Sequence, residues 1–308
     1  MENSTLVTLL LFNLLLSSCA LNKTFLKPTQ IADDATSETL YIQGDTVTVN
    51  YLGKNNQPQF IRNAAPSCLP AGGQGGDTVQ FNHSIESVMF ESTSGNLLNG
   101  WMIKSKEIKP KATILYLHGN SRDIASTHWS MNKLLKHGFQ VFAIDYSGYG
   151  MSQGKATRKN VLKDGNSSLN YLLTRPDIKG TKMIIYGQSL GAHLAVVVAK
   201  QNEDKIDALI TEGAFSSHKA IGREFAGFLG TLFVKEEYSA VDSIGGFHKP
   251  ILIIHSTEDD IVPFRMGKEL FKHANEPKEF YEIDGCHICG SRIYANEIES
   301  KILKMINL

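Results

Sequence analysis

The sequence lacks several features that would mark particular classes of protein. Lys plus Arg and Asp plus Glu both total 31, so the formal net charge is zero, and no run rich in Lys or Arg occurs. This balance gives no indication of a nucleic-acid-binding protein. There is no internal repeat of solenoid length and no long low-complexity tract, which argues against a repeat architecture. Over 308 residues, 42% hydrophobic and 20% charged, the composition is that of a soluble chain with one large domain or two small ones.

An apolar run long enough to span a bilayer is not apparent, and the first residues carry no positive charge. Residues 6–16 are apolar except for Thr8 and Asn13, a stretch too short for a membrane span but suited to the apolar core of a signal peptide. The segment before it contains Glu2 and no Lys or Arg, unlike most signal peptides. A plain secretory signal and a short uncleaved anchor therefore remain alternatives.

Small residues stand just before the first cysteine. The residues LSSC at 16–19 resemble the lipobox of bacterial lipoproteins, in which the cysteine is lipidated and becomes the mature N-terminus. We therefore predict a signal peptide over residues 1–18, lipidation of Cys19 and a polar, lipid-anchored tether over residues 19–38. Ala20 rather than Asp follows the cysteine, and in this respect the sequence resembles lipoproteins that are sent to the outer membrane, if the cell is Gram-negative. The expected localisation is that of an exported, membrane-anchored lipoprotein.

Cysteine is scarce, with four residues in the chain. If Cys19 is lipidated, then Cys68, Cys286 and Cys289 remain, an odd number in an export compartment, so at most one disulfide forms and its pairing stays open. The residues CHIC at 286–289 are not predicted to bind a metal, because no second ligand pair at zinc-like spacing occurs elsewhere. No metal or cofactor is expected.

Short apolar runs alternate with helical patterns along most of the chain. The expected strands are 87–91, 97–104, 112–117, 139–144, 183–186, 206–211, 251–255 and 279–283. The expected helices are 124–137, 161–173, 190–200, 264–273 and 293–306. This alternation predicts an α/β fold with a mostly parallel central sheet covered by helices on both faces, and the hairpin of the first two strands makes its N-terminal edge antiparallel.

Three further segments complete this picture. Residues 40–52 favour a strand or hairpin, and residues 66–77, rich in Pro and Gly, favour a loop. Residues 214–249 interrupt the alternation of strands and helices and contain several Phe and Leu residues, which predicts a small helical lid. We therefore expect one domain over residues 39–308 with the lid at about 214–249.

The clearest chemical motif is Gly187-Gln188-Ser189-Leu190-Gly191. It follows an apolar strand and opens a helix, the strand–turn–helix context in which G-x-S-x-G holds a nucleophilic serine. The sharp turn needs glycine at both ends because side chains there would clash, and the helix N-terminus favours developing negative charge. We therefore predict Ser189 as the nucleophile rather than a structural serine at a helix start.

A serine hydroxyl needs a base to become a good nucleophile. His287 follows the last expected strand, so its ring can reach the carboxyl edge of the sheet where Ser189 lies. A base is normally oriented by an acid, and the consecutive carboxylates of residues 258–260 follow the preceding strand. Glu212, after an earlier strand, is a further candidate for this acid.

The oxyanion that forms during acyl transfer needs two backbone N–H donors. Leu190 directly follows the nucleophile and is expected to supply one. The other is expected from the loop after the strand 112–117, where Gly119 permits close approach and Asn120 is the predicted donor. His118 in the same loop is expected to be a packed structural residue rather than a second base.

With these motifs assembled, the chain from about residue 86 to its end resembles the α/β-hydrolase superfamily. The matching segments are LHGN at 117–120, DYSGYGMSQG at 145–154, GQSLG at 187–191, FSS at 215–217, HSTEDDIVP at 255–263 and DGCH at 284–287. Within that superfamily, the chain resembles the small-lid serine hydrolases. These include esterases, monoacylglycerol-lipase-like enzymes, serine aminopeptidase-type proteins and protein depalmitoylases. Ser147 departs from the pattern, since related sequences usually have Arg there.

The resemblance also selects the acid. The segment 255–263 is similar to the H-G-x-x-D-x-x-V-P pattern of many α/β-hydrolases, and the Asp of that pattern aligns with Asp259. Ser256 replaces the usual glycine. The resemblance thus implies a triad of Ser189, His287 and Asp259, in which the acid fixes the histidine tautomer without taking its proton.

The leading functional prediction is a serine hydrolase that cleaves an acyl ester or thioester through an acyl-enzyme. Its expected partners are a small-molecule or lipid-like acyl substrate and, through Cys19, a membrane. A serine peptidase or aminopeptidase is the alternative, although no anchoring site for a peptide terminus is evident. A catalytically silent binding lipoprotein is a third possibility, against which the complete triad argues. The fold hosts many chemistries, so the motifs do not select the substrate.

Overall fold

The computed structural model describes residues 25–31, 35–42, 45–63 and 76–307. The predicted signal peptide, Cys19, the first part of the tether, most of the loop 66–77 and Cys68 lie outside the described residues.

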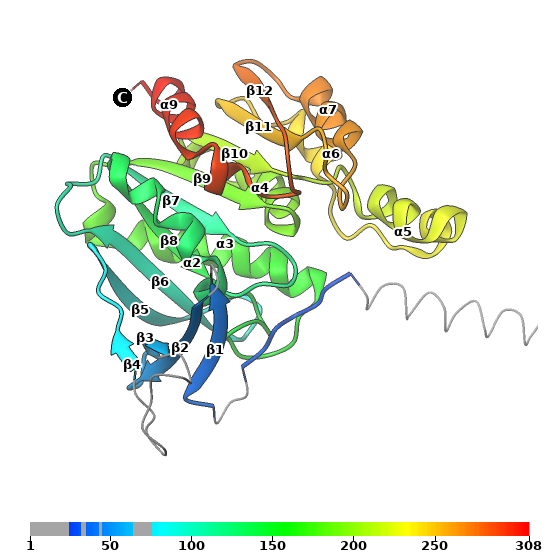
Figure 1. Ribbon diagram of the computed structural model, residues 1–308. Coiled ribbons are helices and arrows are strands. Elements are labelled where there is room, and N and C mark those ends of the chain that lie inside the picture. The colour runs from blue at the N-terminus through cyan, green and yellow to red at the C-terminus, as the bar shows by residue number, and fades with distance from the viewer. Residues whose placement is uncertain (1–24, 32–34, 43–44, 64–75, 308) are drawn as a thin grey trace, which may run out of the picture.

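An eight-stranded sheet forms the centre of the protein, in the order β12-β11-β10-β9-β7-β8-β6-β5 (Figure 1). Its strands are β5 (His83–Glu91), β6 (Leu97–Ser105), β7 (Ala112–Leu117), β8 (Phe139–Ile144), β9 (Lys182–Gln188), β10 (Ala208–Glu212), β11 (Ile251–Ser256) and β12 (Lys278–Ile283). Neighbouring strands from β8 to β12 run parallel. Strand β6 is antiparallel to both β5 and β8. The predicted sheet with its antiparallel N-terminal edge is confirmed.

Helices cover both faces of this sheet, which is why its central strands are buried and largely apolar. All residues of β7, β8 and β11 are buried. One apolar core includes buried side chains of α3 (Arg158–Thr174), α4 (Leu190–Gln201), α6 (Ala240–Ile244) and α7 (Phe264–His273). The core on the other face includes side chains of α2 (Ile124–Met131) and α9 (Ala295–Met305).

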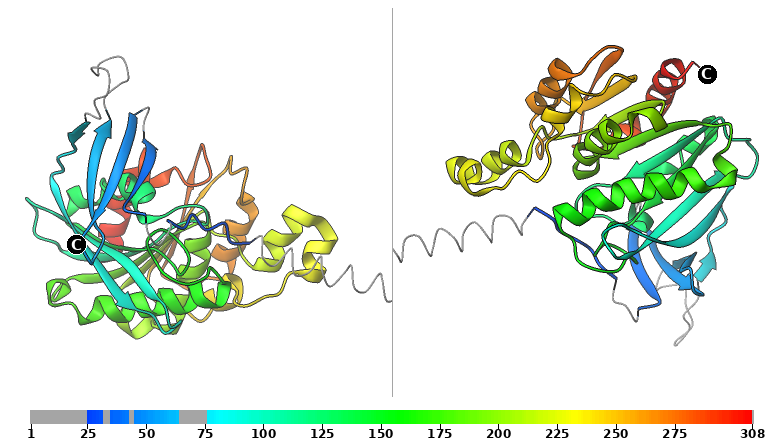
Figure 2. Two further views of the ribbon diagram at one scale, coloured as in Figure 1. Left: turned by 90° about the horizontal axis from the view of Figure 1, so that it is seen from below. Right: turned by 180° about the vertical axis from the view of Figure 1, so that it is seen from behind.

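A second, antiparallel sheet packs on the same face as α2 and α9 (Figure 2). From one edge of this sheet to the other, its strands are β1 (Ser37–Ile42), β2 (Asp45–Leu52), β3 (Gln57–Asn63) and β4 (Gly76–Thr78). The pair β1–β2 is the hairpin expected over residues 40–52. The other two strands were not predicted. Buried Val47, Val49 and Phe60 join this sheet to the core.

Two expected helices are interrupted in the structure. The helix predicted over residues 124–137 ends at Met131 and is followed by the 3-10 turn η2 (Leu134–His137), which Gly138 ends with a φ of 87°. The helix predicted over residues 293–306 is α9, preceded by the separate short turn α8 (Gly290–Ile293). Two further 3-10 turns are η3 (Pro176–Ile178) and η4 (Glu203–Lys205).

The described part of the predicted tether does not extend away from the domain. Leu26 is buried in the core. The backbone of residues 29–31 pairs with Gly150. The Gly150 N–H donates to the Thr29 carbonyl oxygen at 2.8 Å, and the Ile31 N–H donates to the Gly150 carbonyl oxygen at 2.9 Å. The tether interpretation therefore does not hold for residues 25–31. The short segment contains three apolar residues that pack on the domain, Phe25, Leu26 and Ile31, and a backbone that binds a loop.

The lid contains α5 (His218–Phe233) and projects from the body of the protein (Figure 1). The residues Ala226 and Gly227 have non-helical backbone angles, with a φ of 56° at Gly227, so α5 consists of two helical halves. The halves approach closely, because a Cβ atom at Gly230 would lie 1.9 Å from the carbonyl oxygen of Gly222. The lid is thus a compact helical hairpin.

Candidate active site

Ser189 stands at the turn between β9 and α4. Its backbone has a φ of 53° and a ψ of −114°, a region that residues other than glycine rarely occupy. A Cβ atom at Gly187 would lie 2.1 Å from the carbonyl oxygen of Gly191, and one at Gly191 would lie 2.0 Å from that of Leu117. These contacts explain why the motif has glycine at both ends. The turn holds the serine at the carboxyl edge of the sheet.

The ring of His287 lies directly against this serine. Its Nε2 is 2.8 Å from Ser189 Oγ, and the side chain is largely buried. Gly213, just after β10, leaves room for the ring, since a Cβ atom there would lie 2.9 Å from His287 Cε1. The structure therefore brings together the two residues that the sequence placed on separate strand ends.

The other ring nitrogen of His287 faces Asp259. His287 Nδ1 is 2.6 Å from Asp259 Oδ2, while Asp259 Oδ1 accepts the Val262 N–H at 2.7 Å. Burial raises the pKa of the Asp259 carboxyl, but hydrogen bonds from His255 and His287, the charge of His287 and the Val262 N–H outweigh it. The pKa consequently lies below its usual range, and the carboxylate stays ionised beside the imidazole.

The neighbouring carboxylates are directed elsewhere. Glu258 Oε2 accepts the N–H of Gly285 at 2.9 Å, and Asp260 is exposed. Glu212 is fully buried, and its carboxylate accepts hydrogen bonds from Tyr186 and other groups away from His287. Of the four acids considered from the sequence, the one that contacts His287 in the structure is Asp259.

The loop expected to complete an oxyanion hole lies beside the serine. A Cβ atom at Gly119 would be 3.5 Å from Ser189 Cβ, and Leu190 begins α4. His118 is buried with its Nδ1 2.7 Å from the Gly119 carbonyl oxygen, and burial lowers its pKa to about 4. A neutral, buried His118 fits the structural role expected for it. The loop that carries Asn120 and the start of α4 at Leu190 both lie next to Ser189.

Comparisons with known proteins identify the family of the chain. The family model described as serine aminopeptidase, S33, matches residues 108–244. YfhR of Escherichia coli K12 is 31% identical over 73% of this chain and 82% of its own length. The human alpha/beta hydrolase domain-containing protein 17B is 30% identical over 70% of this chain and 73% of its own. The chain belongs to the α/β-hydrolase family.

Solved structures share the fold of this α/β hydrolase. The esterase Pf2001 of Pyrococcus furiosus superposes with a TM-score of 0.60 at 20% identity, covering 73% of this chain and 92% of that one. Est1E of Butyrivibrio proteoclasticus, solved with ferulic acid, has a TM-score of 0.61 at 18% identity and covers 72% and 100% of the two chains. These structures therefore show that the chain has an established fold.

Two contacts in this α/β hydrolase could not be read from its sequence. The Asn120 side chain binds the chain near its first described residue: Nδ2 donates to the Phe25 carbonyl at 2.8 Å, and Oδ1 accepts the Lys27 N–H at 2.9 Å. His255 Nε2 lies 3.3 Å from Asp259 Oδ2, giving the acid a second histidine neighbour. The one hint of the His255 contact in the sequence was that His255 begins the family-like segment 255–263. No sequence pattern indicated the Asn120 contact.

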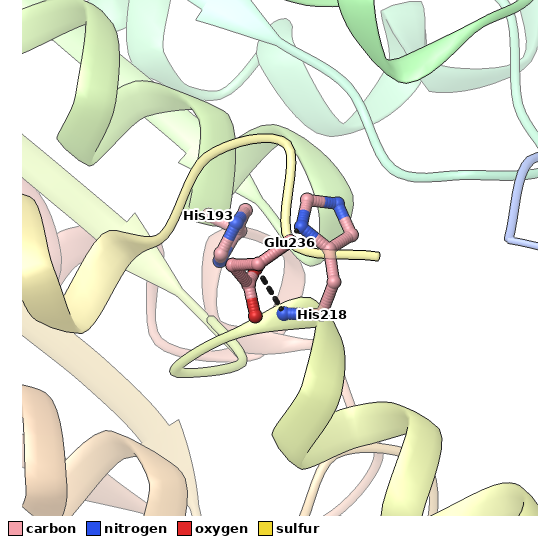
Figure 3. Close-up of side chains that lie close together, drawn as sticks. All are labelled: His193, His218 and Glu236. Atoms are coloured by element: carbon pink, nitrogen blue, oxygen red, sulfur yellow. Dashed lines mark hydrogen bonds and ion pairs between the residues drawn. The ribbon is translucent and has the colours of Figure 1, made fainter. Parts of the chain in front are cut away.

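Three side chains at the root of the lid come close enough to suggest a metal site (Figure 3). The ligand atoms of His193, His218 and Glu236 lie within 4.8 Å of one another. However, His193 Nδ1 is 2.9 Å from the Phe215 carbonyl oxygen, and its Nε2 is 3.2 Å from that of Tyr238. Glu236 Oε1 in turn accepts the backbone N–H of His218. His218 Nδ1 lies 2.9 Å from Glu236 Oε1 and 3.0 Å from the Tyr238 carbonyl oxygen. Because each of these atoms lies within hydrogen-bond distance of another protein group, we interpret the cluster as a polar connection between the lid and α4.

Glu212 connects the serine strand to the loop that follows the histidine. Its carboxylate accepts hydrogen bonds from the Tyr186 hydroxyl and Gln188 Nε2, both at 2.7 Å, and from the Gly290 N–H at 2.6 Å. In Glu212→Gln, one oxygen becomes an NH₂ group that faces donors. We expect the free energy of unfolding to fall by about 1–3 kcal/mol. Urea unfolding measures it, with exposed Glu297→Gln as the control. Equal stability of the two variants would contradict this role.

Proposed function

We propose that this α/β hydrolase is a serine hydrolase that cleaves an acyl ester or thioester through an acyl-enzyme on Ser189. The observation that carries the proposal is the position of His287, with one ring nitrogen 2.8 Å from Ser189 Oγ and the other 2.6 Å from Asp259 Oδ2. This arrangement suits transfer of the hydroxyl proton to a base that a buried carboxylate orients.

The chemistry follows from that geometry. Ser189 Oγ attacks the acyl carbon while its proton moves to His287 Nε2, and Asp259 stabilises the imidazolium without taking the proton. The N–H groups of Leu190 and Asn120 stabilise the developing oxyanion. The leaving alkoxide or thiolate takes the proton from His287 as the acyl-enzyme forms. Water, activated by the same histidine, then releases the acid and regenerates Ser189.

The competing activities are distinguished by substrate. A panel of p-nitrophenyl esters of graded acyl length, beside aminoacyl anilides, tests ester against amide cleavage. We expect turnover of the esters and little turnover of the anilides, because the described residues offer no recognised anchor for a peptide terminus. Preferred cleavage of the anilides would favour the peptidase, to which the description of the matching family model also points. A folded protein that neither turns over the panel nor labels with a fluorophosphonate would favour the binding lipoprotein.

We also propose that the protein is exported and held at a membrane by lipid on Cys19, at the outer membrane if the cell is Gram-negative. The support is the LSSC sequence after the apolar run 6–16. None of the helices in the described part of the chain has both the length and the apolar character needed to cross a membrane.

Replacement of Cys19 tests the anchor. We expect Cys19→Ser to remove acyl modification and to shift the protein out of the detergent phase on phase separation, because the serine hydroxyl cannot form the thioether. Mass spectrometry of the protein from its native host measures the modification. Cys286→Ser is the matched control, since it also removes one thiol. An unmodified Cys19 in the native protein would contradict the lipoprotein assignment.

A further inference from the structure

The outer end of the lid exposes large apolar side chains to solvent. We define the lid tip as residues 225–232, where the two helical halves of α5 meet (Figure 1). Four of its side chains are exposed: Phe225 by 71%, Phe228 by 76%, Leu229 by 52% and Leu232 by 60%. Soluble proteins rarely gather several such residues on one exposed element without a partner. Packing within the protein does not account for them.

Charged residues flank this tip but do not occur within it. No charged residue occurs from Phe225 to Val234, whereas Arg223 and Lys235 stand on either side of the run. Glu224, the nearest acid before the tip, forms an ion pair with Arg265. A groove of about 510 Å³ behind the tip is lined by Lys219 and residues 232–237. Glu236 and Glu237 line the same groove, so charges of both signs stand at the base of an apolar tip. An apolar tip on a charged base suits the boundary between acyl chains and lipid headgroups.

The described chain begins at the root of the same lid. The ring of Phe25 packs edge-on against His218, the first residue of α5, with 5.7 Å between ring centres. The Arg158 guanidinium lies over the other side of that ring at 5.1 Å. Cys19 is six residues before Phe25, a length of chain that spans at most about 20 Å. A membrane that holds a lipid on Cys19 therefore lies within reach of the lid.

We propose that the lid tip binds the surface of the lipid bilayer that holds the N-terminal anchor. The active-site edge of the sheet, where Ser189 and Asn120 lie, then faces that bilayer. This inference rests on the proposed function and deepens it, because an enzyme so oriented draws acyl esters or thioesters from the membrane rather than from bulk water. The occupant of the tip is lipid, and a second copy of the chain is the alternative that the experiment tests.

Tryptophan fluorescence in the full chain tests the contact. Phe228→Trp places an indole on the tip. Tyr41→Trp places one on β1, a strand that lies away from α5 (Figures 1 and 2), at a position that is 86% exposed. Both variants keep the native N-terminus and the same Trp101 and Trp129 background. With vesicles of phosphatidylglycerol and brominated phosphatidylcholine, we expect the indole at position 228 to be quenched at least about threefold more than that at position 41. Equal quenching at the two positions, or none at either, would overturn the proposal.

Activity gives a second readout. The double variant Phe225→Ser, Phe228→Ser is expected to lose about tenfold in kcat/KM on an ester embedded in vesicles, because less enzyme binds the surface. Its turnover of soluble p-nitrophenyl acetate is expected to match that of the wild type. Equal activity of both proteins on the vesicle ester would overturn lid docking. If the wild type hydrolyses neither substrate, the proposed function fails, while the quenching experiment still decides the membrane contact.

Sedimentation without vesicles tests the alternative occupant. We expect the wild type and the double variant to show the same dependence of mass on protein concentration. A wild type that self-associates where the double variant does not would show that the tip is covered by a second copy of the chain, and would overturn the lipid assignment.

Discussion

Replacement of Ser189 by alanine is expected to abolish covalent labelling by a fluorophosphonate and to lower turnover of a p-nitrophenyl ester by at least about a thousandfold. Alanine has no oxygen to attack the acyl carbon, while the residual rate reflects binding and the oxyanion donors. The turn itself should persist, because Gly187 and Gly191, not the hydroxyl, relieve its close contacts. Thermal unfolding of the variant verifies that the fold remains.

A serine far from the site provides the control for this result. Ser300 is exposed on α9, and Ser300→Ala should label and turn over substrate like the wild type. Full labelling of a folded Ser189→Ala protein would show that another residue is the nucleophile, and the proposed mechanism would fail.

The second large effect is expected from the acid. Asp259→Asn should lower kcat by at least about a hundredfold with substrate binding little changed, because an amide of the same shape favours the wrong tautomer of His287. In the structure the productive tautomer, with its proton on Nδ1, is held by the contact of 2.6 Å between His287 Nδ1 and Asp259 Oδ2. Steady-state kinetics on one activated ester measures kcat and KM separately.

The adjacent acids are matched controls for this change. Asp260→Asn alters an exposed carboxylate, and Glu258→Gln keeps a carbonyl oxygen that can accept the Gly285 N–H. Each should stay within about tenfold of the wild type. If either control loses more activity than Asp259→Asn, the assignment of the acid is wrong. If Glu212→Gln is the crippled variant instead, the orienting acid is the last residue of β10.

The sequence predicts the central sheet well because its signals are local. Apolar runs such as ATILYL at 112–117 are buried on both sides, so they read as strands without knowledge of their neighbours. The turn at Ser189 is equally local, since its glycines, strand and helix are contiguous. Placement of Asp259 needed more, because three consecutive carboxylates follow β11 and only a family pattern separated them.

What the sequence did not reveal depends on contacts between distant segments. Strand β3 has the sequence QPQFIRN, in which Phe60 is the one fully buried residue, so its pattern does not distinguish a strand from a loop. Strand β4 has three residues and is defined by its pairing with β3. The contact of Asn120 with Phe25 and Lys27 likewise joins residues more than ninety positions apart, at separations of 95 and 93.

That last contact sets an order of events during folding. Residues 25–31 are synthesised before the residues that they bind. These include Asn120, and also Ser152, which lies 122 positions after its partner Gln30. We expect residues 25–31 to dock after β7 and β8 have formed the edge that carries those loops, because closing such long loops is entropically costly. The first described segment to leave the ribosome is therefore among the last to take its place. The loop that carries Asn120 gains its contacts with Phe25 and Lys27 at that step. The candidate active site is therefore completed when residues 25–31 dock on a sheet that has already formed.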